Sequence, residues 1–229
     1  MNGVTANIHT AQEQIAELEK QIGRPRGSVT LLAVSKRQPV AKIREAAAAG
    51  LRDFGENYLQ EAVEKQRHLE DLPKLIWHFI GPIQSNKTRG ISENFDWVHS
   101  VDRSKIARRL SEQRPPHLKP LNICIQVNLS EEDTKSGTTT TKAADLCALT
   151  DSLKNIRLRG LMAIPAPTDN IYVQRENFMA LSRLFDTLQS KHPSMDTLSM
   201  GMSNDYGPAI LQGSTMIRLG TALFGPRPQ

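Results

Sequence analysis

Short apolar runs of strand length alternate with longer amphipathic helical patterns along almost the whole sequence. This alternation is typical of β–α–β units around a parallel sheet. Eight runs are predicted as strands, at residues 30–36, 52–56, 75–81, 97–101, 122–129, 157–164, 197–201 and 216–224. Seven helices are predicted between them, at residues 40–49, 58–69, 85–92, 104–113, 141–153, 173–190 and 205–211. Eight strands favour a closed (β/α)8 or TIM barrel of the α/β class, with an open doubly wound sheet as the alternative.

The first residues of the sequence carry an amphipathic pattern of their own. In residues 1–23 apolar side chains recur at three- and four-residue spacing, which predicts an extra N-terminal helix that would cover the position after the eighth strand. No linker, low-complexity tract or long run of charge interrupts the sequence. We therefore expect residues 1–229 to form a single barrel domain.

Charge and cysteine content argue against several classes of protein. The formal net charge is +5 and the isoelectric point is about 9.3, but Lys and Arg are spread along the chain among Asp and Glu. This distribution favours a mildly basic protein that binds small anions over a nucleic-acid-binding protein. Cys124 and Cys147 have neither metal-ligand nor disulfide spacing, and no run approaches the ~20 apolar residues of a membrane span. We expect a cytoplasmic protein that binds neither nucleic acid nor a membrane.

Lys36 ends the first predicted strand, after a run of apolar residues. The C-terminal ends of the strands of a TIM barrel face the active site. An apolar environment around a lysine stem favours the neutral, nucleophilic form of its amine. Lys36 is therefore a candidate for covalent bonding to a carbonyl ligand, and the alternative is a lysine that extends from a strand end into solvent.

Glycines and hydroxyls follow the last two predicted strands. Ser203 comes after the seventh strand, and Gly220 and Thr221 lie in the eighth. Loops after strands seven and eight are the usual phosphate site of a TIM barrel, because glycine lets backbone N–H groups approach an anion. Each pair alone is typical of a turn, and together they favour a phosphate site.

Arg218 stands in an otherwise apolar part of the eighth predicted strand, two residues before Gly220. Alternation along a strand would place Arg218 and Gly220 on the same face. A buried arginine requires partners, because its charge cannot be removed at ordinary pH. Those partners would belong either to a ligand or to a structural ion pair.

Six stretches, in order along nearly the whole chain, resemble the pyridoxal phosphate homeostasis protein family. They are LLAVSK (31–36), FGENY (54–58), WHFIGPIQSNK (77–87), GLMAI (160–164), SMGMS (199–203) and RLGTALFG (218–225). The resemblance implies a fold-type III barrel, similar to the N-terminal domain of alanine racemase, with pyridoxal 5′-phosphate held as a Schiff base on Lys36. It also implies that Arg218 faces the pyridine nitrogen and that Asn57 flanks the ring. The phosphate would be held by Ser203, Gly220 and Thr221.

Other polar residues receive weaker assignments. Gln38 stands where lysine is expected in some bacterial members of the family, which puts in doubt a second basic group beside the cofactor. Lys135 follows the fifth strand and is interpreted as a solvated loop residue within possible reach of the barrel mouth. His78 is interpreted as a satisfied histidine at a strand surface, and His99 alone does not make a metal site. We expect no metal.

The resemblance implies a protein that binds, buffers and delivers pyridoxal phosphate rather than an enzyme. An arginine at the pyridine nitrogen weakens the ring as an electron sink, and the sequence stops after the eighth strand, where the racemases continue into a β-rich domain. Apo forms of pyridoxal phosphate enzymes are the expected recipients, and we expect a monomer. The alternatives are a small pyridoxal phosphate-dependent amino-acid racemase and a cofactor-free Schiff-base aldolase.

Overall fold

The computed structural model describes residues 3–129 and 136–226. Its strands are all parallel and form one closed barrel in the order β1 to β8, with β8 paired to β1. The strands are β1 (Thr30–Val34), β2 (Asp53–Glu56), β3 (Ile76–Phe79), β4 (Trp97–Val101), β5 (Leu121–Gln126), β6 (Ile156–Met162), β7 (Thr197–Met202) and β8 (Met216–Leu219). The predicted TIM barrel is therefore confirmed, and the open sheet is wrong.

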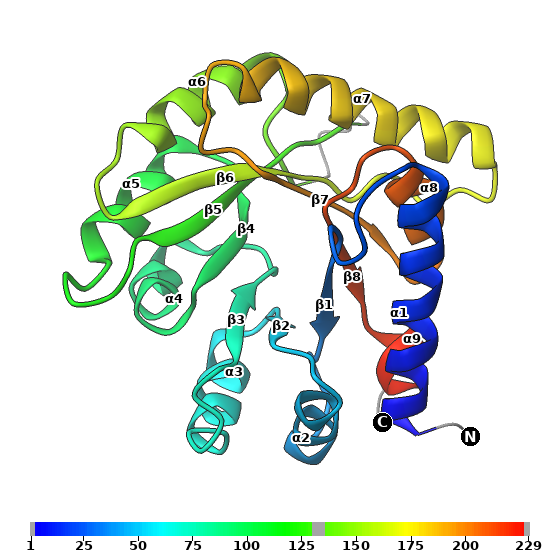
Figure 1. Cartoon of the computed structure of the whole chain (residues 1–229). Helices are drawn as coiled ribbons and strands as arrows, with labels where there is room; N and C mark the ends of the chain where they lie inside the picture. Colours follow the sequence, from blue (N-terminus) through cyan, green and yellow to red (C-terminus); the bar gives the residue numbers. More distant parts are fainter. Residues whose placement is uncertain (1–2, 130–135, 227–229) are drawn as a thin grey trace.

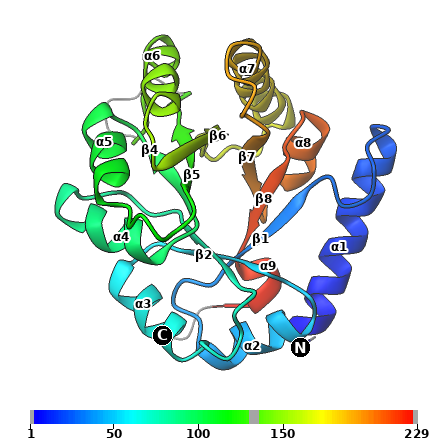
Figure 2. The same ribbon diagram turned by 60° about the vertical axis from the view of Figure 1, so that its left-hand side comes forward.

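Helices surround the barrel, as Figures 1 and 2 show from two directions. They are α1 (Val4–Gln21), α2 (Val40–Ala48), α3 (Leu59–Arg67), α4 (Thr88–Asn94), α5 (Ser104–Gln113), α6 (Thr140–Asp151), α7 (Ile171–Gln189), α8 (Tyr206–Leu211) and α9 (Thr221–Phe224), with a 3-10 turn η1 (Ser85–Lys87) before α4. The longer connecting helices bury an apolar face, such as Ile106, Ala107 and Leu110 of α5 or Phe178, Leu181 and Phe185 of α7. No helix of the described residues is long and apolar enough to cross a membrane.

The N-terminal helix lies where the sequence predicted it. Val4, Ile8, Ala11 and Ile15 are the buried apolar residues of α1. These side chains lie three or four residues apart and so share one helix face. The helix contacts α2, α8 and α9, and it lies beside α8 on the outside of the barrel in both views (Figures 1 and 2). It thus covers the gap between the last and first connecting helices.

The eighth strand is shorter than its apolar sequence predicts. Residues 221–224 were expected to continue the strand, but they form the short helix α9. Gly220 has φ −116° and ψ −83°, which is not extended backbone, and its carbonyl accepts hydrogen bonds from the N–H groups of Leu223 and Phe224 at 2.9 Å. The apolar run was misleading because Leu223 and Phe224 are buried as helix residues. Thr221 therefore opens a helix instead of lying inside a strand.

The barrel interior contains polar as well as apolar side chains. Ile76, Trp97, Cys124 and Met162, from four successive strands, form an apolar cluster separate from the main core. Beside it, His99 of β4 contacts Ser199 of β7. Because β4 and β7 are not neighbours in the sheet, this contact crosses the interior.

Candidate functional site at the barrel mouth

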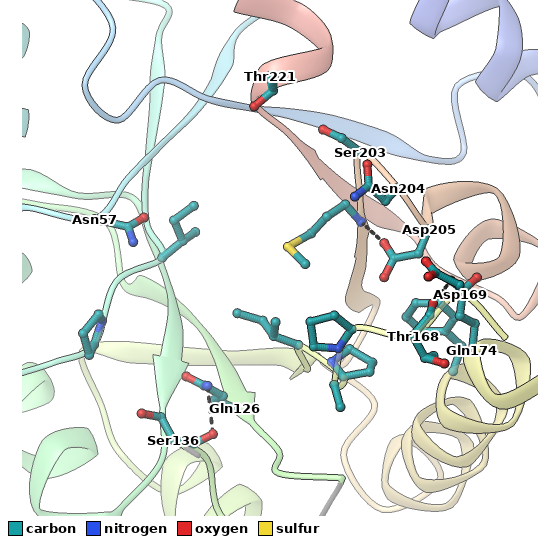
Figure 3. A pocket seen from close by; sticks show the side chains of 18 residues that line it. Asn57, Gln126, Ser136, Thr168, Asp169, Gln174, Ser203, Asn204, Asp205 and Thr221 are labelled. Carbon is teal, nitrogen blue, oxygen red and sulfur yellow. Dashed lines mark hydrogen bonds between the residues drawn. The ribbon is translucent and has the colours of Figure 1, made fainter. Parts of the chain in front are cut away.

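A cavity of about 920 Å³ opens at the C-terminal ends of the strands. Its lining residues follow six different strands, and Figure 3 shows their side chains around a common space. Among them are Asn57 after β2, Ile164–Asp169 after β6, Ser203–Asp205 after β7 and Thr221 after β8. The volume lies within the range of about 300–1,000 Å³ that ligand pockets usually occupy. The cavity is the candidate functional site.

Three of the six predicted site residues line this cavity: Asn57, Ser203 and Thr221. Figure 3 shows Ser203 and Thr221 close together on one side and Asn57 across the space from them. Gly220 lies next to the end of β1, since a Cβ atom at this glycine would be 3.5 Å from both Cβ and the carbonyl oxygen of Val34. Lys36 and Arg218 are not among the lining residues.

Lys36 lies in a turn rather than in a strand. β1 ends at Val34, so the predicted strand end at residue 36 is two residues too long. Arg37, next to Lys36, has a left-handed backbone with φ 58°, which is rare for a residue with a side chain and ends the extended conformation. Because residues 33 and 34 pair with β2 and residues 30–33 pair with β8, the turn leaves the barrel between Asn57 and Gly220.

A buried ionic cluster fixes this turn, and the sequence analysis missed it. Lys65 of α3 donates hydrogen bonds to the Ser35 carbonyl (2.7 Å), to Glu56 Oε1 (2.8 Å) and to Glu61 Oε1 (2.6 Å). The hydroxyl of Ser35 donates to Glu56 Oε1 at 2.6 Å, and the Arg37 N–H donates to Glu61 Oε1. One signal was available in the sequence, the four-residue spacing of Glu61 and Lys65, which favours an ion pair on one helix face.

Burial raises the pKa of the Glu56 carboxyl, and the nearby Lys65 ammonium lowers it in part. The side chain of Glu56 is 0% exposed and that of Lys65 is 7% exposed. Each of these charges would be costly to bury alone. The pair is therefore tolerated in the interior only while its hydrogen bonds keep the two groups together. The cluster therefore fixes the backbone on both sides of Lys36, at Ser35 and Arg37.

Asn57 approaches the cavity because the chain after β3 passes unusually close to it. A Cβ atom at Gly81 would lie 2.3 Å from the Asn57 carbonyl oxygen, so only glycine permits this approach. The side-chain Oδ1 of Asn57 is buried and has no hydrogen-bond partner among the described residues. A buried acceptor in this state indicates a position for a ligand donor or a bridging water.

Gly201 positions the Ser203 loop in a similar way. It has φ +94°, and a Cβ atom there would lie 2.6 Å from Cβ of Ala209 in α8. The chain after Gly201 turns tightly, and the Met202 N–H donates to Asp205 Oδ1 at 2.6 Å. Ser203 and Asn204 consequently lie at the tip of this turn, facing the cavity (Figure 3).

Arg218 is 4% exposed and lies inside the barrel. Nη1 donates to the Ser199 carbonyl (2.7 Å) and hydroxyl (2.8 Å), and Nη2 donates to the Ala163 carbonyl (3.0 Å). These bonds use three of the five guanidinium N–H donors, and no carboxylate of the described residues forms a salt bridge with the group. Burial lowers the pKa of Arg218 to about 10, and the nearby Asp205 opposes this effect, so the side chain stays charged at neutral pH.

The two interior histidines differ from the sequence interpretation. His78 does not lie at a strand surface; it is fully buried, with hydrogen bonds to Asp53 and His99 at 3.0 Å. Alternation along β3 could have shown that His78 shares the inward face with Ile76. In the described part of the chain, no group of three or more His, Cys, Asp or Glu side chains is placed to hold a metal ion.

Two further residues from the sequence analysis remain. Lys135 lies outside the described residues. Gln38 is 4% exposed, and its Oε1 atom is buried with no hydrogen-bond partner in the described chain. Gln38 thus lies buried directly beyond the turn that carries Lys36.

These groups suit a flat, anionic, carbonyl-bearing ligand. Arg218 offers two spare N–H donors to a heteroatom acceptor, and Asn57 has a buried atom without a partner. Ser203 and Thr221 place two hydroxyl groups on one side of the cavity, suited to an oxyanion. The donor set therefore fits the predicted cofactor, with a pyridine nitrogen, a phosphate and an aldehyde.

Comparisons with known proteins agree with this geometry. The chain matches the family described as alanine racemase, N-terminal domain, over residues 7–228. It is 56% identical over 227 residues to the pyridoxal phosphate homeostasis protein of Pseudomonas aeruginosa, which covers 99% of this chain and 97% of the relative. The structure of PipY of Synechococcus elongatus with pyridoxal phosphate bound is 39% identical, with a TM-score of 0.80, and the match covers 92% of this chain and 100% of that one.

A more distant likeness concerns the fold alone. Alanine racemase of Corynebacterium glutamicum is 17% identical with a TM-score of 0.71, over 99% of this chain and 61% of the racemase. The racemase chain therefore contains a large part with no counterpart in the match. Sequence identity over nearly the full length, with the barrel and the residues at its mouth, shows that this chain belongs to the pyridoxal phosphate homeostasis protein family.

Proposed function

We propose that residues 1–229 form one domain that binds pyridoxal 5′-phosphate at the barrel mouth, through a Schiff base on Lys36. Arg218 faces the pyridine nitrogen and Asn57 flanks the ring. The phosphate is held by Ser203, Gly220 and Thr221. The bound PipY structure and the names of the close relatives support the binding of pyridoxal phosphate, and the residue roles rest on the geometry of the barrel mouth.

The buried guanidinium of Arg218 is the observation that carries the proposal. A fully buried cation without an anionic partner is costly unless a ligand completes its hydrogen bonds. Arg218 keeps two N–H donors beyond its bonds to Ser199 and Ala163. A pyridine nitrogen is an acceptor of matching size and polarity, and it removes part of that cost.

The same contact favours a carrier over an enzyme. When bound, the cofactor supplies an aldehyde for Lys36 and a ring that can accept electrons. A fixed cation that donates a hydrogen bond to the ring nitrogen disfavours ring protonation and so weakens the electron-accepting role. We propose that the protein buffers pyridoxal phosphate in the cytoplasm as a monomer and delivers it to apo-enzymes.

An absorption spectrum before and after borohydride reduction, followed by peptide mass mapping, tests the linkage. Reduction is expected to fix the cofactor on the peptide that contains Lys36. Lys36→Arg keeps the positive charge but cannot form the linkage, and it is expected to lose the reducible absorption band. Lys105→Ala, which changes an exposed lysine of α5, serves as the matched control. Label on another lysine, or an unchanged band in Lys36→Arg, would overturn the assignment.

A further inference from the structure

From Arg218, a chain of hydrogen-bonded polar side chains crosses the barrel interior toward the end that lies opposite the cavity. The Arg218 guanidinium bonds the Ser199 hydroxyl at 2.8 Å, and this hydroxyl lies 3.0 Å from Nδ1 of His99. Nε2 of His99 lies 3.0 Å from Nδ1 of His78, and Nε2 of His78 lies 3.0 Å from Asp53 Oδ1. We refer to Asp53, His78, His99 and Ser199 as the interior network.

The interior network is isolated from solvent except at one end. Ser199, His99 and His78 are 0% exposed, whereas the side chain of Asp53 is 23% exposed. Asp53 is the first residue of β2, so it lies at the end of the barrel away from the cavity. The network thus connects the two ends of the molecule through its core.

The chemistry of its two ends gives the network a direction. A guanidinium can only donate hydrogen bonds, and a carboxylate can only accept them. Asp53 therefore accepts from Nε2–H of His78, which leaves Nδ1 of a neutral His78 to accept from Nε2–H of His99. Nδ1 of His99 then accepts the proton of the Ser199 hydroxyl, which itself accepts from Arg218. Each group donates once toward Asp53.

The surroundings favour a neutral imidazole at His99. Burial, with the nearby His78 and the Arg218 cation, lowers the pKa of His99 well below its usual value. The ring of His78 stacks on Trp97, with 5.4 Å between ring centroids and an angle of 11° between planes. Among the described residues, the charged or titratable groups around the network are Asp53, Arg218, Asp205, the Cys124 thiol and Arg159. The Arg159 guanidinium lies over the Trp97 ring and bonds Asp196.

We propose that Asp53, His78, His99 and Ser199 are positioning residues, which orient the Arg218 guanidinium and couple its hydrogen bonding to the opposite end of the barrel. This inference rests on the proposed contact between Arg218 and the pyridine nitrogen. The hydrogen bonds from Arg218 to Ser199 hold Nη1 and thereby restrict rotation of the guanidinium plane. Cooperative polarisation along such a line transmits a change at Asp53 to Arg218.

The first test uses the protein without cofactor. Long-range proton–nitrogen NMR spectra distinguish the two neutral tautomers and the doubly protonated form of each histidine. His78 and His99 are both expected as the neutral Nε2–H tautomer. In Asp53→Ala, where the final acceptor is lost, His78 is expected to lose its single tautomer. An Nδ1–H tautomer at His99, or a doubly protonated His78 at neutral pH, would overturn the direction of the network.

The second test measures the coupling to the cofactor. Asp53→Ala is expected to shift the absorption band of the bound cofactor and to weaken its binding, although Asp53 lies at the other end of the barrel. Asp196→Ala removes the same charge from that end, where Asp196 bonds Arg159 but not the network, and is expected to leave the band in place. Equal bands in wild type and Asp53→Ala would refute the coupling.

A double-mutant cycle separates the network from a general effect of charge. Ser199→Ala interrupts the line between Arg218 and His99, so Asp53→Ala is expected to have little further effect in that background. The non-additivity in Kd is expected to reach at least about twofold, the lower end for residues of one network. Strictly additive effects would refute the proposal.

The two proposals fail in different ways. If Arg218→Met leaves the cofactor band unaltered, the assigned contact with the pyridine nitrogen is wrong, and so is the coupling to the cofactor. The tautomers in the cofactor-free protein still decide whether the network orients Arg218. If Arg218→Met shifts the band and Asp53→Ala does not, the proposed function stands and the coupling is refuted.

Discussion

Replacing Lys65 with methionine keeps the length of the side chain but removes the ammonium group that three oxygen atoms share. These atoms are the Ser35 carbonyl oxygen and Oε1 of both Glu56 and Glu61, at 2.6–2.8 Å. Removal of one partner of a buried ion pair costs about 3–5 kcal/mol, because the other charge is left uncompensated. At about 2–4 °C per kcal/mol for a domain of this size, the melting temperature of Lys65→Met is expected to fall by ~6–20 °C.

The penalty is expected to depend on pH in a defined direction. Burial holds the pKa of Glu56 above its ordinary value in the folded state, and the loss of Lys65 raises it further. A carboxyl of this kind contributes its full stability below the unfolded pKa, about 4.3, and loses it as pH rises through the folded pKa. Lys65→Met is therefore expected to be closest to wild type in acid and most destabilised at neutral pH.

Thermal unfolding followed by circular dichroism, at pH values from about 4 to 8, measures this difference. Arg44→Met removes the same charge from the exposed pair between Arg44 and Asp71 and is expected to change the melting temperature little. Glu56→Gln combined with Lys65→Met removes both charges and is expected to recover part of the loss at neutral pH. A penalty that is equal at all pH values, or absent, would refute the reasoning.

Two further predictions concern the cofactor contacts. Arg218→Glu, with Arg218→Met as a neutral second variant, is expected to shift the absorption band of the bound cofactor and weaken its binding. A folded variant with the wild-type band and affinity contradicts the assigned contact. Unphosphorylated pyridoxal is expected to bind at least about 100-fold more weakly than the phosphate form, since two charge-assisted hydrogen bonds are lost. Equal affinities in a calorimetric titration would exclude the phosphate site at Ser203 and Thr221.

The barrel could be predicted because most of its strands are largely buried and read as short apolar runs, such as β1 and β5. The same rule explains the error at residues 221–224, since Leu223 and Phe224 are equally apolar and equally buried in a helix. Only the backbone of Gly220, which leaves the extended conformation, distinguishes the two cases. Glycine permits such a change of backbone conformation, but its presence alone does not predict the change.

The candidate site was predictable only in part, for a related reason. Lys36 ends the first predicted strand and Ser203 follows the seventh, and this position alone indicates the barrel mouth. Thr221 was expected inside the eighth strand and opens a helix instead. Partners that meet across the interior carry no such signal, because the contact between His99 and Ser199 joins residues a hundred positions apart. Closure of the barrel brings them together, and spacing along the sequence cannot show it.

The last prediction concerns what the bound cofactor does. Inversion of an amino acid requires removal of a proton from one face of the α-carbon and addition of a proton on the other face, by groups with suitable pKa values. Among the described residues, the ionisable side chains that line the cavity are Asp169 and Asp205, and Asp205 already accepts a hydrogen bond from the Met202 N–H. By contrast, the proposed Schiff base on Lys36 would be reversible, and Ile164 at the cavity is 46% exposed, so a ligand there is accessible to exchange.

Holo-protein incubated with an apo pyridoxal phosphate enzyme is therefore expected to restore that enzyme's activity. The transfer is followed as the loss of the holo-protein band together with the gain of enzymatic activity. Chiral analysis of incubations with alanine or serine is expected to show no inversion above that of Lys36→Ala, which lacks the linkage. Inversion at enzymatic rates that depends on Lys36 would contradict the carrier function and favour the racemase, because it would show that the aspartates or the lysine complete a proton-transfer pair.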